Sequence, residues 1–341
     1  MQFASLVKRI GGSRVDAWKI HAEAVAAAAR NEDVIVLSVG DPEFAAPAVV
    51  TSAAVAALQA GDTHYTSISG RLPLRERIAR QHSRSSGQPV DAGNVVVVGG
   101  AQNGMFVASL CLCEAGDEVL VPEPLYLTYE ATIRASGATL VPLPVHPDDG
   151  FRIDIQALRE AITPRTRAIF FATPCNPTGV AMRRHELQAI ADLAIAHDLW
   201  VVADEVYGAL TFEAEHISIA GLAGMAERTV TVSSLSKSHA MAGFRIGWAV
   251  APTELIHHMG NLLLCMLYGA AGFTQEAACA ALDQHDAVTA DIRATYRRRR
   301  DRVHQLLADV PGLVCRLPEA GMFMLLDVRA TGLTSAEFAW G

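Results

Sequence analysis

The sequence predicts an α/β fold whose mostly parallel sheet is covered by helices on both faces. Short β-branched runs alternate with longer amphipathic stretches in the middle of the chain. These runs are apolar at nearly every position rather than at alternate positions, which is typical of parallel strands that are buried on both faces. The predicted strands are 95–98, 118–121, 139–143, 168–172, 200–203 and 229–232.

The two ends of the chain differ from this centre. Residues 1–45 are predicted to hold a helix, a strand over 34–39 and a turn, and the residues after 285 a long charged helix and a strand-like run over 321–328. We therefore expect an N-terminal arm and part of a small domain over 1–45, a large domain over 46–285, and the rest of the small domain over 286–341. Two domains agree with the length of 341 residues.

Composition excludes several classes of function. The chain has 28 Lys and Arg against 36 Asp and Glu, and this net charge of −8 argues against a nucleic-acid partner. It has no signal-peptide pattern and no run of about 18 apolar residues, so we expect a cytoplasmic protein without a membrane partner. The 6 Cys and 12 His are dispersed without paired spacing, so no metal site is predicted.

Polar residues follow the predicted strands, at the sheet edge where α/β proteins bind ligands. Gly100, Ala101 and Gln102 follow the first strand and open a helix, whose free N–H groups suit a phosphate. Alone, such a turn more often reflects tight packing. It lacks the GxGxxG and GxxxxGK[ST] patterns, which disfavours nicotinamide and nucleoside triphosphate cofactors.

The later strands are followed by an amide, a carboxylate and an amine. Asn176 lies in a turn-rich loop after 168–172, which on its own could be a simple connector. Asp204 and Tyr207 follow the strand 200–203, although such a carboxylate could also cap a helix. Lys237 follows 229–232 among serines, where a single lysine would usually belong to the surface.

One cofactor, pyridoxal 5′-phosphate, needs all of these groups together. Its phosphate needs a cradle, its aldehyde an amine, its pyridine nitrogen a carboxylate and its ring hydroxyl hydrogen-bond donors. Asn176, Asp204, Tyr207, Lys237 and Arg245 supply these groups in a compatible order and spacing. The sequence therefore predicts a pyridoxal-phosphate site.

The sequence resembles the class I aminotransferases, which are fold type I pyridoxal-phosphate enzymes. The motifs that carry the resemblance are NPTG at 176–179, DEVY at 204–207 and SLSK at 234–237, followed by Arg245. They are highly specific as a set, and the resemblance extends over essentially the whole chain. It implies a large domain with a seven-stranded, mostly parallel sheet and a smaller α/β domain.

The resemblance also implies the role of each site residue. Lys237 would form the Schiff base, Asp204 would pair with the ring nitrogen, and Tyr207 and Asn176 would bond to the ring oxygen. The residues implied to hold the phosphate are Gly100, Ala101, Gln102, Ser234, Ser236 and Arg245. Tyr126 would stack on the ring, Gly40 would adjoin the substrate, and Tyr65 would reach the phosphate of a neighbouring subunit, which implies a homodimer with shared sites.

The implied reaction moves an amino group from an L-amino acid to a 2-oxo acid with ping-pong kinetics. The amino acid displaces Lys237, which then transfers the Cα proton. The runs 234–248 and 264–269 are more similar to arginine–pyruvate members of the family than to aspartate-type members, so arginine and pyruvate are the favoured substrates. Another pyridoxal-phosphate chemistry, such as a β-lyase, remains an alternative.

Family members continue a few dozen residues beyond the position of Gly341. That tail carries the arginine that binds the substrate's α-carboxylate. No residue here matches it, since Arg329 precedes the tail. We therefore expect a small domain that is incomplete at its carboxyl end. A truncated, catalytically impaired pyridoxal-phosphate-binding protein is the second alternative.

Overall fold

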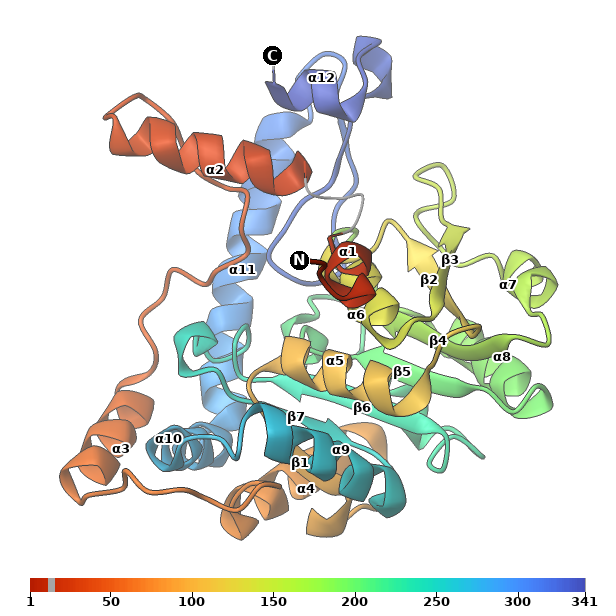
Figure 1. Cartoon of the computed structure of the whole chain (residues 1–341). Helices are drawn as coiled ribbons and strands as arrows, with labels where there is room; N and C mark the ends of the chain where they lie inside the picture. Colours follow the sequence, from red (N-terminus) through yellow and green to blue (C-terminus); the bar gives the residue numbers. More distant parts are fainter. Residues whose placement is uncertain (12–15, 341) are drawn as a thin grey trace.

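A computed structural model describes residues 1–11 and 16–340, which form a three-layered α/β body with further helices above it (Figure 1). The central sheet has 7 strands in the order β1-β7-β6-β5-β4-β2-β3. Its strands are β1 (Val95–Val98), β2 (Glu118–Glu123), β3 (Thr139–Pro144), β4 (Thr166–Ala172), β5 (Trp200–Asp204), β6 (Thr229–Ser234) and β7 (Gly247–Val250). The predicted α/β class and seven-stranded sheet are confirmed.

The sheet is mostly parallel. Strands β3, β2, β4, β5 and β6 pair in parallel, while β7 runs antiparallel to both β6 and β1. Strand β1 therefore points the same way as the parallel strands. The carboxyl ends of β1, β2, β4, β5 and β6 consequently lie along one edge, where β7 begins.

Helices cover both faces of the sheet (Figure 1). Helices α5 (Ala101–Leu112), α6 (Thr128–Ser136) and α9 (Thr253–Met266) pack on one face. On the opposite face lie α4 (Leu72–Ser86), α7 (Ile155–Ala161), α8 (Arg184–Ala196) and α10 (Gly272–Asp283), and α3 (Ala48–Gln59) packs against α10. No helix among the described residues is long and apolar enough to cross a membrane.

The two helical layers explain why strands that are buried on both faces, such as β1, lack the alternation of apolar and polar residues. In β1, Val96 and Val98 belong to the core under α5 and α9, whereas Val95 and Val97 belong to the core under α4 and α10. All four valines are 0% exposed. Strands between two layers of helices have no face toward solvent, so their sequences do not alternate between apolar and polar residues.

The terminal segments of the chain lie above the sheet (Figure 1). Helix α11 (His285–Leu307) rises from the layered body toward α2 (Asp16–Ala29) and α12 (Ser335–Trp340), while α1 (Ser5–Arg9) lies against α6 (Figure 1). The long charged helix after residue 285 is thus confirmed. The division into 1–45, 46–285 and 286–341 stays a prediction.

Two predicted strands at the ends need correction. Residues 34–39 form no strand, and Ile35 and Leu37 are 81% and 86% exposed. An apolar run becomes a strand only where a neighbouring strand completes its hydrogen bonds, and within residues 1–11 and 16–340 no strand lies beside this run. Of the run 321–328, only Leu326–Asp327 (β9) is a strand, and it pairs with Val314–Cys315 (β8).

Candidate active site

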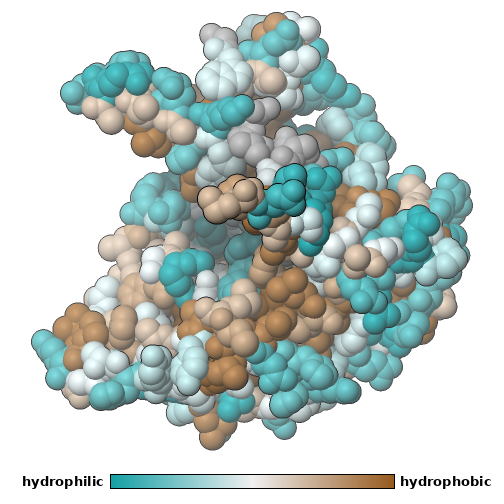
Figure 2. Space-filling model, viewed as in Figure 1, coloured by the Kyte–Doolittle hydropathy of each residue, from teal (hydrophilic) through white to brown (hydrophobic). Residues whose placement is uncertain are grey.

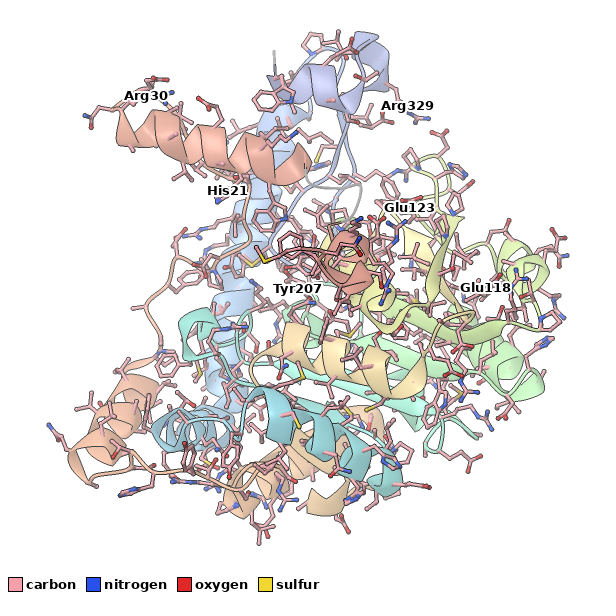
Figure 3. The ribbon with its side chains drawn as sticks, viewed as in Figure 1. His21, Arg30, Glu118, Glu123, Tyr207 and Arg329 are labelled. Atoms are coloured by element: carbon pink, nitrogen blue, oxygen red, sulfur yellow. The ribbon has the colours of Figure 1, made fainter. Side chains whose placement is uncertain are left out.

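The predicted cofactor residues converge at the carboxyl edge of the sheet. Asp204 ends β5 and Ser234 ends β6, while Gly100 follows β1. The backbone N–H of Thr173 donates to the carbonyl oxygen of Asp204 over 3.0 Å, which fixes the loop carrying Asn176 beside β5. Residues far apart in sequence therefore line one side of the molecule, and Tyr207 marks it in Figure 3.

A positively polarised turn lies between β1 and α5. The N–H groups of Ala101 and Gln102 are in the first turn of α5, where a helix offers no carbonyl partner. The guanidinium of Arg245 is next to them and donates to the carbonyl oxygen of Gly99 over 3.0 Å. Gly100 has φ +90°, and a Cβ there would lie 2.3 Å from Arg245 Nη2. The missing side chain of Gly100 therefore leaves room for the guanidinium, which brings two kinds of anion-binding donor together at this turn.

The side chain of Gln102 does not face this turn. Its Nε2 donates to Thr132 Oγ1 over 2.7 Å, and its Oε1 accepts from Thr128 Oγ1 over 2.5 Å. Both partners belong to α6. Gln102 can thus offer the turn its backbone N–H, while its amide fixes α6 against α5.

Asp204 lies at the centre of the site. Its Oδ1 accepts from the Val206 N–H over 3.1 Å, and its Oδ2 accepts from the Tyr129 hydroxyl over 2.8 Å. Burial raises the pKa of Asp204 above its usual value, and these two hydrogen bonds act in the opposite direction. A cationic partner would further favour the ionised carboxylate.

Tyr129 is a site residue that the sequence did not reveal. It is 2% exposed, and its ring lies edge-on to that of Tyr126, with centroids 5.8 Å apart. Tyr126 is 37% exposed at the site, where burial and the charge of Asp204 raise its pKa. Tyr126 lies in the loop just before α6 and Tyr129 in the first turn of that helix, where the Tyr129 N–H donates to the Tyr126 carbonyl oxygen over 3.0 Å. The spacing of three residues between the two tyrosines was the available signal.

Lys237 reaches across the site to the N-terminal segment. Its Nζ donates to the carbonyl oxygen of Gly40. Burial is the largest cause that lowers the pKa of Lys237; Arg245 lowers it further, whereas Asp41 and Asp204 oppose the shift. The neutral, nucleophilic amine is therefore easier to form here than on an exposed lysine.

Tyr207 and Asn176 complete the group. Asn176 Nδ2 donates to Tyr207 Oη over 3.5 Å, and a Cβ on Gly40 would lie 4.0 Å from that oxygen. Burial raises the pKa of Tyr207, which keeps the phenol protonated. The ring of Phe323 packs edge-on at a centroid distance of 5.0 Å. Segments near both ends of the chain, at Gly40 and at Phe323, thus border the site.

Comparison with known proteins identifies the family. Residues 32–339 match the family described as aminotransferase class I and II. This chain belongs to that family. The class I and II aminotransferases depend on pyridoxal 5′-phosphate, so this aminotransferase uses that cofactor.

Individual relatives agree with the family assignment. The aminotransferase is 49% identical to the arginine–pyruvate transaminase of Pseudomonas aeruginosa, covering 99% of this chain and 86% of the relative. It is 34% identical to an aspartate aminotransferase of Musicola paradisiaca, over 98% and 84% of the two chains. A solved aspartate aminotransferase of Thermus thermophilus, a single mutant, superposes with a TM-score of 0.91 at 32% identity, over 97% and 88% of the chains.

The site of this aminotransferase fits the cofactor. Pyridoxal phosphate carries an anionic phosphate, a basic ring nitrogen and an aldehyde. The turn at Gly100 with Arg245 offers donors to an anion, Asp204 offers a carboxylate, and Lys237 offers an amine whose pKa is lowered. These three groups match the three reactive ends of the cofactor.

Two residues discussed from the sequence lie apart from this cluster in the aminotransferase. Tyr65 is 85% exposed, and its ring lies 4.8 Å from that of Tyr268. Arg329 pairs with Asp148 at 2.7 Å and Asp327 at 2.6 Å, high above the edge at which Tyr207 lies (Figure 3). Arg329 is therefore engaged in a surface ion-pair group.

The lowered pKa of Lys237 predicts how cofactor capture depends on pH. Between the lowered pKa and the ordinary value of 10.5, the folded chain holds a neutral amine while the unfolded chain still holds the proton. The rate of pyridoxal-phosphate capture should therefore rise as the pH passes the lowered pKa and then level off, whereas the free energy of unfolding of the cofactor-free protein should rise with pH across the whole window. Stopped-flow absorbance and urea titrations at several pH values would measure them.

The variant Asp41→Asn provides the control for this dependence. Asp41 raises the pKa of Lys237, so its neutralisation should move the capture profile to lower pH. A profile that Asp41→Asn leaves in place, or that rises only near the pKa of an exposed lysine, would contradict the prediction.

Proposed function

We propose that this aminotransferase transfers the amino group of L-arginine to a 2-oxo acid such as pyruvate. The observation that carries the proposal is the 49% identity to an arginine–pyruvate transaminase along 99% of the chain, against 34% to an aspartate aminotransferase along 98%. Both relatives are named for amino-group transfer, which does not favour a β-lyase. Arginine and pyruvate are metabolites of the cytoplasm, where we expect the enzyme to act.

The proposed roles follow from the positions of the side chains. Pyridoxal phosphate, when bound, supplies an electron-withdrawing ring that acidifies the substrate's Cα–H bond. Asp204 would keep the ring nitrogen protonated, and Tyr207 with Asn176 would donate to the ring oxygen. Lys237 would bind the aldehyde carbon and, once displaced, move a proton at the substrate's Cα. The lowered pKa of this amine supports that role.

The remaining residues would hold and bound the cofactor. The proposed phosphate ligands are the N–H groups of Ala101 and Gln102, the guanidinium of Arg245 and the hydroxyls of Ser234 and Ser236. Both serines are buried, at 2% and 8% exposure, and the Ser236 N–H donates to Ser234 Oγ over 3.3 Å. Tyr126 would cover the ring, and Gly40 would leave space for the substrate.

We further propose that the enzyme is a homodimer in which Tyr65 binds the partner subunit's phosphate. Tyr65 and Tyr268 present 85% and 51% of their surface to solvent, next to the exposed apolar end of α9 at Leu264, Met266 and Leu267. Hydrophobic surface is visible where α5 and α9 lie (Figure 2). An exposed apolar patch with two phenols is typical of a surface that another subunit covers.

Absorption spectroscopy of the full chain with pyridoxal phosphate tests the substrate proposal. L-arginine should bleach the visible band of the bound cofactor, and pyruvate should restore it with the formation of alanine. L-aspartate at the same concentration should react at least about 100-fold more slowly in kcat/KM if the enzyme shares the specificity of its arginine-transaminating relative, because a site that accepts a cationic side chain disfavours an anionic one.

Other outcomes would overturn the proposal in distinguishable ways. Faster bleaching by L-aspartate than by L-arginine would contradict the arginine assignment. Release of ammonia without alanine would indicate a lyase. A band that no amino acid changes would support an impaired cofactor-binding protein.

A further inference from the structure

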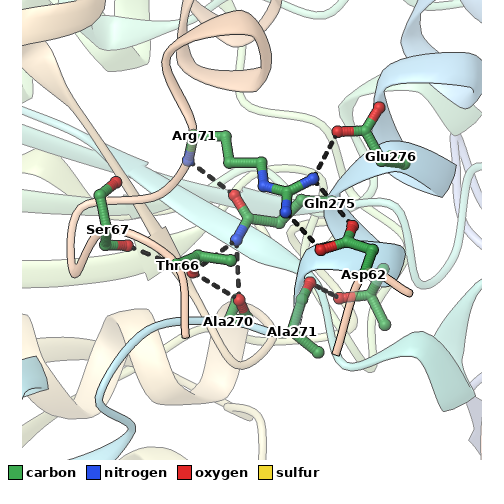
Figure 4. A network of polar contacts seen from close by, with 9 residues as sticks. Asp62, Thr66, Ser67, Arg71, Ala270, Ala271, Gln275 and Glu276 are labelled. Carbon is green, nitrogen blue, oxygen red and sulfur yellow. Dashed lines mark hydrogen bonds and ion pairs between the residues drawn. The ribbon is translucent and has the colours of Figure 1, made fainter. Parts of the chain in front are cut away.

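We propose that Gln275, with Thr66 and Arg71, positions Tyr65 to reach the partner subunit's cofactor phosphate; this inference rests on the proposed dimer. These residues belong to a polar network between residues 60–71, here called the Tyr65 loop, and the start of α10 (Figure 4). The loop joins α3 to α4, and Tyr65 is its exposed aromatic residue.

Gln275 is the buried centre of this network. It is 0% exposed, and its Nε2 donates to the carbonyl oxygen of Ala270 over 2.7 Å and to Thr66 Oγ1 over 3.1 Å. Its Oε1 accepts from the backbone N–H of Arg71 over 2.7 Å. Thr66 Oγ1 itself donates to the Ala270 carbonyl over 2.8 Å. One amide thus holds the loop both directly after Tyr65 and at the loop's end.

Arg71 closes the loop on itself. Its Nη2 and Nη1 bind Asp62 Oδ1 and Oδ2 at 2.5 and 2.9 Å, and Nη1 also binds Glu276 Oε1 at 2.7 Å. The bidentate pair joins the beginning and the end of the loop, and Glu276 attaches this pair to α10. Such planar pairs fix orientation as well as distance.

Two glycines allow this arrangement. A Cβ on Gly272 would lie 2.3 Å from Asp62 Oδ1. The first turn of α10 therefore needs a glycine at this position, so that the ion pair can pack against its backbone. Gly70 has φ +93°, and a Cβ there would lie 2.3 Å from Val97 Cγ2 in β1. The Val97 N–H donates to the Ser69 carbonyl over 3.0 Å, so the loop is also fixed to the central sheet.

The contrast between the base of the loop and its tip supports the inference. The base contains a fully buried amide and a bidentate ion pair, while Tyr65 contacts the ring of Tyr268 and is otherwise open to solvent. A rigid base under an exposed phenol lowers the entropy lost when that phenol binds a ligand on another subunit. The network therefore acts on cofactor affinity through Tyr65.

The dissociation constant of pyridoxal phosphate from the dimer formed by the whole 341-residue chain tests the proposal. Tyr65→Phe removes one hydroxyl and should weaken binding about 10-fold. Gln275→Leu and Thr66→Val should each weaken it roughly 3- to 10-fold, and Thr66→Ser, which keeps the hydroxyl, should restore it. If Gln275→Leu does not fold, the comparison of Thr66→Val with Thr66→Ser tests the proposal instead.

Arg77→Ala is the matched control. Arg77 pairs with Asp283 at 2.8 Å, also between α4 and α10, but outside the Tyr65 loop. Loss of this pair should change the dissociation constant less than about two-fold, because partly exposed ion pairs contribute little. An equal effect of Arg77→Ala and Thr66→Val would overturn the proposal, because contact between the helices rather than the loop would then control affinity.

A double-mutant cycle separates positioning from a general structural effect. If Thr66 acts through Tyr65, then Thr66→Val should weaken binding little further in a Tyr65→Phe background. Additive losses would overturn the positioning role while leaving the role of Tyr65 intact. An unchanged affinity in Tyr65→Phe would instead overturn the role of Tyr65 itself, whether or not the enzyme transaminates arginine. Losses confined to concentrations at which the dimer dissociates would assign the network to assembly.

Discussion

Lys237→Ala is expected to lower the kcat of arginine transamination by about 10,000-fold or more, since in the proposed mechanism both bond formation to the aldehyde carbon and proton transfer depend on this amine. The Nζ lies within hydrogen-bond reach of the Gly40 carbonyl, beside the segment that bounds the proposed substrate space. A substituted methyl group can neither attack nor carry a proton. Formation of alanine from pyruvate gives the rate.

The same variant should still bind the cofactor noncovalently. The turn at Gly100 and the guanidinium of Arg245 are independent of the Lys237 side chain. Dialysis against phosphate, followed by absorbance, would separate retained affinity from lost chemistry. Lys8→Ala, in α1, serves as the matched control and should keep the normal rate. A Lys237→Ala enzyme as active as the parent would refute the assignment.

Asp204→Asn should reduce kcat by roughly 100- to 1,000-fold with a smaller change in KM, because it removes a preorganised negative charge and keeps the shape of the side chain. The carboxylate accepts hydrogen bonds from Tyr129 and Val206, so it is held in one orientation. Without its charge, the ring nitrogen would lose its proton and withdraw fewer electrons. Single-turnover kinetics with L-arginine would measure this step.

Tyr129→Phe provides a graded comparison for Asp204→Asn. It removes the 2.8 Å hydrogen bond but retains the ring and the carboxylate, so we expect a loss of kcat of about 10-fold. A kcat of Asp204→Asn within about three-fold of the parent would contradict the electrostatic role.

Much of the fold could be predicted because the sequence of each buried strand, taken by itself, already indicates a strand that is covered on both faces. The buried strands lie between two helical layers, and burial on both faces makes their sequences almost wholly apolar, as in Val95–Val98. The run 34–39 has a similar composition but no strand to pair with. Composition reports the tendency of a segment, whereas pairing depends on which segments the fold brings beside it.

The candidate site could be predicted where a polar side chain stands at the carboxyl end of a strand or directly after it. Asp204 and Ser234 end their strands, so their place at the edge follows from the parallel topology. The hydrogen bond from Tyr129 to Asp204 joins residues 75 positions apart, and no local pattern specifies it. The side chain of Gln102 likewise turned to α6, because its partners Thr128 and Thr132 arise from packing between helices.

The antiparallel strand β7 has a consequence for the order in which the site assembles during folding. The chain leaves the sheet edge at Ser234 and returns beside it at Gly247, so one short connection carries both Lys237 and Arg245. Closing a short loop costs little entropy, whereas parallel pairing of β4, β5 and β6 requires long crossovers. We therefore expect the two basic groups to meet early, before the Asp204 carboxylate arrives to balance their charge.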